Sequence, residues 1–447
     1  MEKRTFLKSL SLSLGASFLP LSSWSCTDPT SGLRTAHIGV GNMGLEDLKA
    51  IASHPEVVVT ALCDVDQNHL EAAHALFPQA QVFKDYRQMF AQIADQIDAV
   101  VVSTPDHTHA PASMLALENN KAVYCQKPLT HYVAESRELR KVANQKNLVT
   151  QMGIQVHSFY DYKLATLLIR GGMVGKVSKV IAWSNKNWGF DGPAPEGADP
   201  IPKTLDWNLW TGTSEERPYK EGIYHPKNWR KLLDYGCATL GDMGVHIFDT
   251  PYNALDLDVP NTISNRCRPS NDFSYPERNI VHYTFDGTAY TTDQFEWLWY
   301  DGVEGPEALE ELQLPEGETL PDQGAMFIGE DGKRLLLPHF MALPKLIKDG
   351  VYADYEIEDY DPQNTLGEPV RDYAGESPKH YHEFVDTCLG KAQCSAPFDY
   401  AARLTETILL GVIAGRFPNQ VLHYDKARSA FVETEANAYL SGQYRNF

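Results

Sequence analysis

Two short stretches of this 447-residue chain carry side chains that could hold a reactant and move a proton. Lys127, immediately before a proline, offers an ammonium group that can hydrogen-bond a substrate hydroxyl and stabilise developing alkoxide character. Asp242 and His246 are four residues apart, so they would share one face of a helix. A carboxylate beside an imidazole fixes its tautomer and raises its basicity, which suits general acid–base work near neutral pH. Taken alone, the same residues also fit a solvated lysine, a capping aspartate and a core histidine.

A third stretch, Thr104–His109, contains two histidines and suggests a zinc site completed by Cys63, Cys125 or Cys237. However, the sequence has no CxxC, HExxH or comparable ligand spacing. We therefore predict no metal centre and place this stretch at a turn and helix start beside a cofactor.

A glycine-rich turn, GVGNMG at residues 39–44, follows a buried strand and opens a helix. In such a turn Gly39 permits the tight bend, Gly41 lets a pyrophosphate approach the backbone, and Gly44 allows close helix–strand contact. The helix amino terminus then supplies unpaired N–H groups and a partial positive charge. This combination predicts a dinucleotide-binding site.

The cofactor preference follows from the end of the next strand. Asp64 stands there, twenty positions after Gly44, where its carboxylate would accept hydrogen bonds from the adenosine ribose hydroxyls. A carboxylate repels a 2′-phosphate, so we predict NAD, with NADP disfavoured. Asp66 is a rival for the ribose contact, although Asp64 is better placed at the strand end.

The elements that must position these residues alternate between strands and helices over the first third of the chain. Such alternation predicts a parallel, doubly wound sheet, with Lys127 at the carboxyl edge where open α/β sheets bind ligands. The predicted strands are 35–40, 57–65, 81–83, 97–103, 121–125 and 148–152, and the predicted helices are 45–53, 69–76, 86–93, 111–119 and 134–147.

The second half of the chain has a different pattern. Residues 303–323 are acidic and rich in proline and glycine, which indicates a surface insertion. The aromatic loop from Trp183 to Trp229 is a candidate platform for a sugar, although core packing would explain most of its tryptophans. Apolar segments at 177–185, 280–285, 289–295, 325–329 and 334–337 predict strands of a mainly antiparallel sheet, and segments 379–389 and 400–414 predict helices.

These patterns predict an α/β protein with two folded domains. Residues 33–155 would form an N-terminal Rossmann domain with a doubly wound parallel sheet. Residues 156–447 would form a C-terminal α/β domain with an open, mainly antiparallel sheet, used for substrate binding and oligomerisation.

Residues 1–32 are predicted to be an export signal and tether. A short basic start precedes a largely apolar stretch, and Lys3-Arg4 resembles a twin-arginine (Tat) signal whose first arginine is lysine. Cys26 is a candidate lipid anchor, and a disordered cytoplasmic extension is the alternative for the whole segment. We expect an exported protein, either periplasmic or a membrane-anchored lipoprotein that faces the periplasm.

The overall charge excludes one class of partner. The chain has 39 Lys+Arg against 59 Asp+Glu, a formal net charge of -20. Such an acidic surface repels phosphate backbones, so we expect no nucleic-acid partner.

Several motifs together resemble one family. GVGNMG, CDVD, STPDHTHA, YCQKP, TQMG and GDMGVH are similar to those of the Gfo/Idh/MocA oxidoreductases, which include glucose–fructose oxidoreductase and inositol dehydrogenase. The resemblance extends from about residue 34 to residue 447, and HIFDTPYNALDL resembles exported bacterial members of carbohydrate-utilising organisms. It implies a homo-oligomer, a dimer or tetramer, with contacts through the open sheet.

The resemblance also implies residue roles. His246 would be the general acid–base, Asp242 its partner, and Lys127 the substrate-positioning cation. The pyrophosphate would lie on Gly39, Gly41, Asn42, Met43 and Gly44, the ribose on Asp64, and the nicotinamide beside Thr104, Pro105, His109, Lys127 and Gln155.

Two departures from the family pattern bear on substrate and cofactor. Gln126 stands where the family usually has glutamate, which removes a charge beside Lys127. Ile154 and Val156 replace a polar and a small residue near the cofactor, so the resemblance does not specify the sugar.

We therefore expect an enzyme that transfers hydride between a carbohydrate C–H(OH) group and nicotinamide. Two alternatives stay open. Because free NAD is scarce outside the cytoplasm, a retained NAD could oxidise a sugar, permit elimination of its glycosidic group and return the hydride, as in related glycosidases. A sugar-binding protein without catalysis is the other alternative, although the presence of Lys127, Asp242 and His246 argues against it.

Overall fold

The computed structural model describes residues 32–302, 305–307, 309–370 and 372–447. Most of the predicted export signal, including Cys26, therefore lies outside the described residues. The chain from Leu33 to Phe447 forms one compact unit that contains two sheets. No helix in the described ranges is long and apolar enough to cross a membrane.

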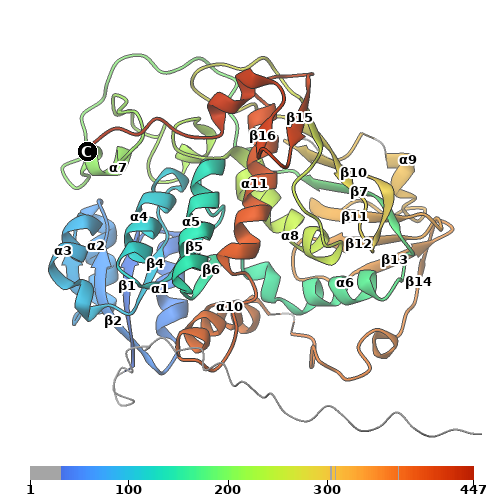
Figure 1. Cartoon of the computed structure of the whole chain (residues 1–447), viewed down its shortest axis with the longest axis horizontal. Helices are drawn as coiled ribbons and strands as arrows, with labels where there is room; N and C mark the ends of the chain where they lie inside the picture. The colour runs from blue at the N-terminus through green and yellow to red at the C-terminus, as the bar shows by residue number, and fades with distance from the viewer. Residues whose placement is uncertain (1–31, 303–304, 308, 371) are drawn as a thin grey trace, which may run out of the picture. The chain divides into compact units, whose positions relative to one another are not determined.

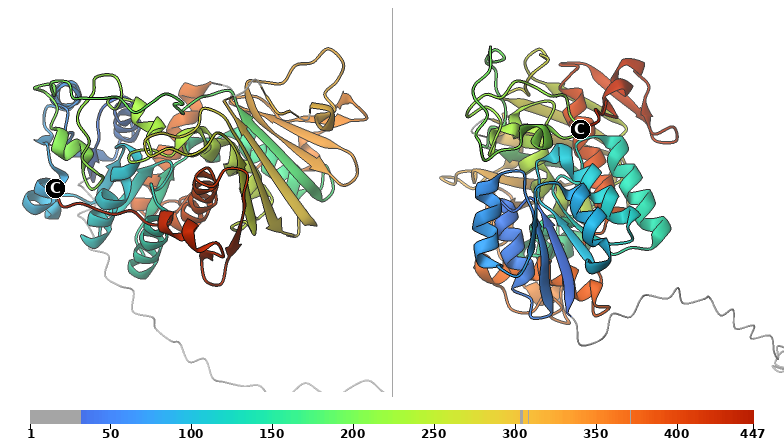
Figure 2. Two further views of the ribbon diagram at one scale, coloured as in Figure 1. Left: turned by 90° about the horizontal axis from the view of Figure 1, so that it is seen from above. Right: turned by 90° about the vertical axis from the view of Figure 1, so that its left-hand side faces the viewer.

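The first sheet has six parallel strands in the order β3-β2-β1-β4-β5-β6, with helices on both faces (Figure 1, Figure 2). A parallel sheet covered on both faces needs apolar residues throughout, and every residue of β4 is buried. This confirms the predicted doubly wound sheet. Its strands are β1 (Leu33–Ile38), β2 (Val57–Cys63), β3 (Gln81–Phe83), β4 (Ala99–Val102), β5 (Ala122–Gln126) and β6 (Thr150–Gly153). Its helices are α1 (Met43–Ala52), α2 (Gln67–Leu76), α3 (Tyr86–Ile93), α4 (Asp106–Glu118) and α5 (Val133–Lys146).

The second sheet has ten strands in the order β14-β13-β12-β11-β7-β10-β9-β8-β15-β16 (Figure 2). Of the pairs between its described strands, only β7 with β10 is parallel, which confirms the mainly antiparallel prediction. The strand predicted to end at residue 295 continues to Asp301, because it pairs with β9 along its length. The strands are β7 (Val177–Ser184), β8 (Thr262–Arg266), β9 (Asn279–Asp286), β10 (Thr291–Asp301), β11 (Gln323–Gly329), β12 (Arg334–Pro338), β13 (Lys345–Lys348), β14 (Val351–Ala353), β15 (Val421–Asp425) and β16 (Ala430–Phe431).

Helices α10 (Tyr373–Cys388) and α11 (Phe398–Ala414) join the two sheets into one core. Helix α11 is apolar on most sides and packs against α5, β8 and α8 (Val245–Ala254), between the two sheets in Figure 1. Helix α10 packs against α1. The other helices are α6 (Tyr160–Arg170), α7 (Trp207–Thr211), α9 (Leu309–Leu312) and a π-helical turn at Leu240–Gly244.

The predicted surface insertion covers part of the second sheet. Leu312 of α9 is fully buried and belongs to one apolar cluster with Trp183 and Met326 of the sheet. Part of the insertion therefore packs on the second sheet of its own chain.

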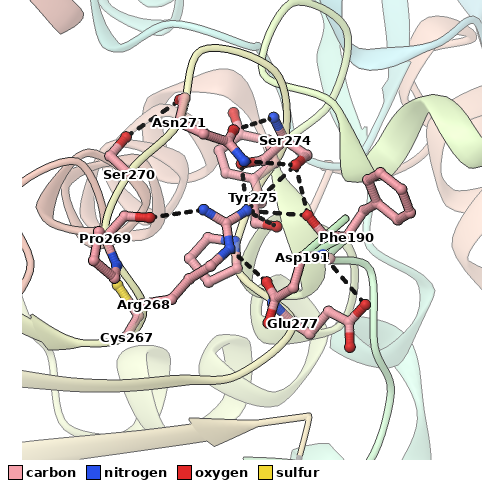
Figure 3. A network of polar contacts seen from close by, with 12 residues as sticks. Phe190, Asp191, Cys267, Arg268, Pro269, Ser270, Asn271, Ser274, Tyr275 and Glu277 are labelled. Atoms are coloured by element: carbon pink, nitrogen blue, oxygen red, sulfur yellow. Dashed lines mark hydrogen bonds and ion pairs between the residues drawn. The ribbon is translucent and has the colours of Figure 1, made fainter. Parts of the chain in front are cut away.

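Residues 204–235, called the aromatic cap below, supply most of a separate apolar cluster that also contains Phe273. The rings of Trp207 and Trp210 stack with their centroids 4.7 Å apart. At the base of the cap, Arg268 donates hydrogen bonds to the carbonyl oxygens of Phe190, Ser274 and Tyr275 (Figure 3). Four of the five tryptophans in the candidate sugar platform are buried, so most of that loop is core: Trp183, Trp207, Trp210 and Trp229.

Candidate active site

A cleft of about 1110 Å³, including space open to solvent, lies at the carboxyl edge of the first sheet. Most of the residues predicted to bind the cofactor line it: Gly39, Gly41, Asn42, Met43, Asp64, Thr104, Pro105, His109 and Lys127. The facing wall comes from the aromatic cap, through Trp210, His225, Trp229 and Arg230, and from Phe447. The sequence analysis proposed the Trp183–Trp229 loop, which contains Trp210, His225 and Trp229, as a sugar platform, but it did not include Arg230 or Phe447 in the site.

The glycine turn has the shape of an anion site. Gly39 has φ +81°, and a Cβ there would lie 2.6 Å from the carbonyl oxygen of Ser103, so this position requires glycine. A Cβ at Gly41 would collide with the ring of His69. No side chain caps the start of α1, which leaves backbone N–H groups for a phosphate. The buried Oγ1 of Thr104 has no partner among the described residues, so the cleft fits a polar, dinucleotide-like ligand.

Asp64 holds the shape of this turn. Its Oδ2 accepts a hydrogen bond from the Val40 N–H at 2.8 Å, and its Oδ1 accepts one from the Asp66 N–H at 2.9 Å. Its hydrogen bond to His69 raises the pKa of that imidazole, although burial opposes the shift. The ribose contact of Asp64 stays a prediction.

The rival carboxylate, Asp66, is shared between a helix and the aromatic cap. It caps α2 by accepting from the Asn68 N–H at 3.0 Å, and its Oδ2 lies 2.9 Å from Nε2 of His225. The ligand atoms of Asp66, His69 and His225 lie within 4.8 Å of one another, a spacing that a metal ion could bridge. Sequence reasoning considered other histidines and missed this group.

The two histidines that suggested zinc bind backbone carbonyls instead. Nε2 of His107 lies 2.9 Å from the carbonyl oxygen of Trp210. Both ring nitrogens of His109 lie 2.8 Å from carbonyl oxygens, those of Pro128 and Thr104. His109 therefore fixes the walls of the cleft around Lys127.

Lys127, directly after β5, and Asp242, in the π-helical turn at Leu240–Gly244, form an ion pair. The Lys127 Nζ lies 2.8 Å from Asp242 Oδ1, and both side chains are 13% exposed. Asp242 also accepts from Nε of Arg230 at 3.1 Å and from Nε1 of Trp188 at 2.6 Å. Burial alone would raise the pKa of Asp242, but Lys127 and Arg230 hold it well below its ordinary value. The carboxylate therefore stays ionised.

This arrangement differs from the expected pairing of Asp242 with His246. The expectation used α-helical spacing, but Asp242 lies in a π-helical turn, and α8 begins only at Val245. Nδ1 of His246 has no hydrogen-bond partner among the described residues. Burial and the charge of Lys127 lower the pKa of His246 well below its ordinary value, so its imidazole is neutral near pH 7.

A second imidazole, missed from the sequence, faces His246. The rings of His246 and His339 have centroids 6.2 Å apart, and Tyr162 hydrogen-bonds Nδ1 of His339. Burial lowers the pKa of His339 to about 4. His339 follows β12, so the second sheet also contributes to the site.

The charge lost at Gln126 is replaced from α1. The Gln126 Nε2 lies 3.0 Å from both carboxylate oxygens of Asp47, which also accept from Ser103 and from Tyr381 at 2.6 Å each. Burial raises the pKa of Asp47 to about 6. Gln155 donates to the Tyr381 hydroxyl at 2.8 Å and, like Asp242 and His246, is not among the residues that line the cleft.

Asp106, at the start of α4, is a further carboxyl of the cleft that the sequence did not single out. Burial raises its pKa to about 7, and the charges of Arg230 and Lys127 oppose that shift. This group therefore titrates in the neutral range.

Two family models match the chain. Residues 33–154 match an oxidoreductase family described as an NAD-binding Rossmann fold, and residues 152–266 match the C-terminal alpha/beta domain of the same Gfo/Idh/MocA family. Together they span more than half of the chain. The chain belongs to the Gfo/Idh/MocA oxidoreductases.

Individual relatives share low sequence identity with this chain or match only part of it. An inositol 2-dehydrogenase of Rhodococcus jostii is 31% identical over 33% of this chain and 40% of its own length, so the chain covers less than half of that relative. An uncharacterized oxidoreductase of Escherichia coli is 24% identical over 81% of this chain and 90% of its own length. The WlbA dehydrogenase of Chromobacterium violaceum, solved with NADH and UDP-GlcNAcA, has a TM-score of 0.62 at 12% identity, covering 89% of this chain and 98% of its own. This likeness shows a shared fold.

Proposed function

We propose that this Gfo/Idh/MocA protein transfers hydride between a hydroxyl-bearing carbon of a carbohydrate and the nicotinamide of NAD. One observation carries the proposal: Lys127 lines the cleft, its Nζ lies 2.8 Å from Asp242 Oδ1, and its charge helps to lower the pKa of the buried His246 imidazole. The inositol dehydrogenase among the relatives and the sugar nucleotide bound to WlbA support a carbohydrate substrate. Asp64 at the end of β2 supports NAD over NADP.

The chemistry divides between three side chains. Bound NAD would supply the hydride acceptor for oxidation and the hydride donor for the reverse reaction. Lys127 donates a hydrogen bond to the reacting hydroxyl oxygen and stabilises the negative charge that develops there. His246, whose imidazole is neutral near pH 7, accepts the hydroxyl proton at its unprotonated ring nitrogen as hydride leaves the carbon. Asp242 remains charged and keeps Lys127 in place.

The test is a single-turnover measurement with NAD and a panel of sugars, polyols and uronic acids, following the absorbance of reduced nicotinamide. We expect reduction with at least one member of the panel, and reduction slower by about 10²-fold or more in His246→Ala. Absence of reduction with every member, in a protein that also gives no calorimetric signal with NAD, contradicts the proposal.

A second candidate function is an NAD-dependent glycosidase, in which the sugar is oxidised, its glycosidic group is eliminated, water adds to the resulting double bond and the hydride is then returned. The outer wall of the cleft, formed by the aromatic cap and Phe447, favours it, because a retained cofactor suits a redox-neutral cycle. Product analysis separates the two: a cleaved glycoside without net NADH supports the glycosidase, and stoichiometric NADH supports the dehydrogenase. A sugar-binding protein without catalysis would give neither a cleaved glycoside nor NADH.

The location and assembly are also proposals. We propose that residues 1–32 direct export, with Cys26 as a lipid attachment point, and that the protein is a homo-oligomer. The amino-terminal mass of protein isolated from its own compartment tests the first, and native mass spectrometry tests the second.

A further inference from the structure

The outer wall of the cofactor cleft begins with a short backbone pairing. The Asp206 N–H donates to the Val65 carbonyl at 3.0 Å, and the Gln67 N–H donates to the Thr204 carbonyl at 2.9 Å. These bonds flank an antiparallel bridge between Asp66 and Leu205. The aromatic cap is therefore attached immediately after Asp64, at the predicted ribose position.

A side-chain pair makes a second attachment at the same place. His225 of the cap lies 2.9 Å from Asp66, and the two side chains are 16% and 10% exposed. The rings of His225 and His69 have centroids 5.3 Å apart, and both line the cleft. The cap thus meets the Rossmann domain through α2 as well as through the backbone after β2.

Residues 444–447 make a third attachment, on the other side of the cap. Arg445 donates to the side chains of Asn208 at 2.8 Å and Thr211 at 2.6 Å, both in α7. The guanidinium of Arg87, in α3, lies 4.0 Å from the ring centroid of Phe447, which itself lines the cleft. This segment runs beside α7 towards the Rossmann helices in Figure 1.

The cap is built as a packed body rather than as an open loop. Its core contains the stacked Trp207 and Trp210, and Val65 of the Rossmann domain packs against the same cluster. Buried aromatic clusters of this kind resist local opening, because each ring that is exposed loses a large apolar contact area. The cap would therefore move as a unit or not at all.

We propose that the aromatic cap and Phe447 form the outer wall of the adenosine half of the cofactor site. NAD(H) then exchanges only when the cap lifts from Val65 and Asp66. While the cap is in place, the cofactor stays bound through successive turnovers. This inference rests on the NAD site of the proposed function. His225 and Phe447 are positioning residues that hold the cofactor's adenosine end, whereas Arg230 of the same cap contacts Asp242 beside Lys127.

The first test measures NADH dissociation from the holoenzyme by fluorescence after a chase with excess NAD. His225→Ala and Arg87→Ala each remove one attachment, and we expect at least about tenfold faster dissociation, because such losses act mainly on the off-rate. The control is His423→Ala, which breaks the exposed pair of His423, on β15, with Glu433 and should exchange like the unchanged protein.

The second test locks the cap. Because the flanking hydrogen bonds make Asp66 and Leu205 a non-hydrogen-bonded antiparallel pair, their Cα atoms should be about 4.5 Å apart, within disulfide range. The double variant Asp66→Cys, Leu205→Cys should hold NADH without measurable release when oxidised, and its oxidised apo form should fail to take up NAD. Reduction of the same protein should restore exchange, faster than in the unchanged protein because the Asp66–His225 pair is gone.

The outcomes separate this inference from the proposed function. If the unchanged protein binds no NAD at all, both fail together. If it binds NAD, but exchange is equally fast in the oxidised, reduced and His225→Ala forms, only the role of the cap is overturned.

Discussion

Two polar pairs connect the Rossmann part of the chain to later segments, and their arrangements are opposite. At the proposed catalytic end the Rossmann residue is the cation, Lys127, whose Nζ lies 2.8 Å from Asp242 Oδ1. At the proposed adenosine end the Rossmann residue is the carboxylate, Asp66, whose Oδ2 lies 2.9 Å from Nε2 of His225. The charge of Lys127 acts on the buried imidazole of His246, whereas the second pair is flanked by backbone hydrogen bonds and packed rings. We infer that one end governs reactivity and the other governs how long the cofactor stays.

The largest expected change in activity comes from a variant that alters only the catalytic end. His246→Ala removes the group assigned to proton transfer, and we expect turnover to fall by about 10²- to 10⁴-fold with unchanged NAD affinity. Steady-state kinetics and calorimetry with NAD measure the two quantities, and His423→Ala serves as the matched control. Full turnover in His246→Ala would remove this residue from the mechanism.

The next effect tests the ion pair at the same end. Lys127→Ala removes the hydrogen bond to the developing alkoxide and leaves Asp242 with Arg230 as its remaining cation, so we expect kcat to fall by about 10²- to 10³-fold. The loss should appear in kcat more than in KM, because the interaction strengthens in the transition state. Lys141→Ala, an exposed lysine on α5, is the control. A change confined to KM would make Lys127 a binding residue only.

The smallest effect concerns Asp106, a cleft carboxyl outside both pairs. Its pKa is 3.8 in the unfolded chain and about 7 in the fold, so the folded state holds an extra proton between these values. Stability should therefore fall as pH rises from about 4 to about 7, by at most about 4 kcal/mol. Asp106→Asn cannot ionise and should flatten this slope, with a gain of about 1–3 kcal/mol at pH 8 and little change at pH 4, measured by urea unfolding. An unaltered slope in the variant would show that Asp106 ionises normally.

The sequence predicted the Rossmann sheet and the glycine turn because both depend on local patterns. Gly39 needs its positive φ, and the strands around it are short apolar runs that alternate with helices. The pairing of Asp242 could not be predicted in the same way, because a π-helical turn changes the rotation between it and His246.

The rest of the site depends on contacts between distant segments. Asp47 replaces the charge lost at Gln126, although 79 residues separate them. His225 meets Asp66 across 159 residues, and Phe447 reaches the cleft from the far end of the described chain. No periodicity or motif marks such contacts, so the sequence indicated an aromatic platform between Trp183 and Trp229 but not its attachment to Asp66 or the place of Phe447 beside it.

The central claim is that a dinucleotide occupies this cleft with its nicotinamide towards the catalytic end. A crystal structure of the protein grown with NAD tests it most directly. We predict density for the pyrophosphate over Gly41–Met43, the adenosine under the aromatic cap, and the nicotinamide beside Lys127 and His246. An empty cleft under saturating NAD, or a nicotinamide that points towards His225 and Phe447, would contradict the account.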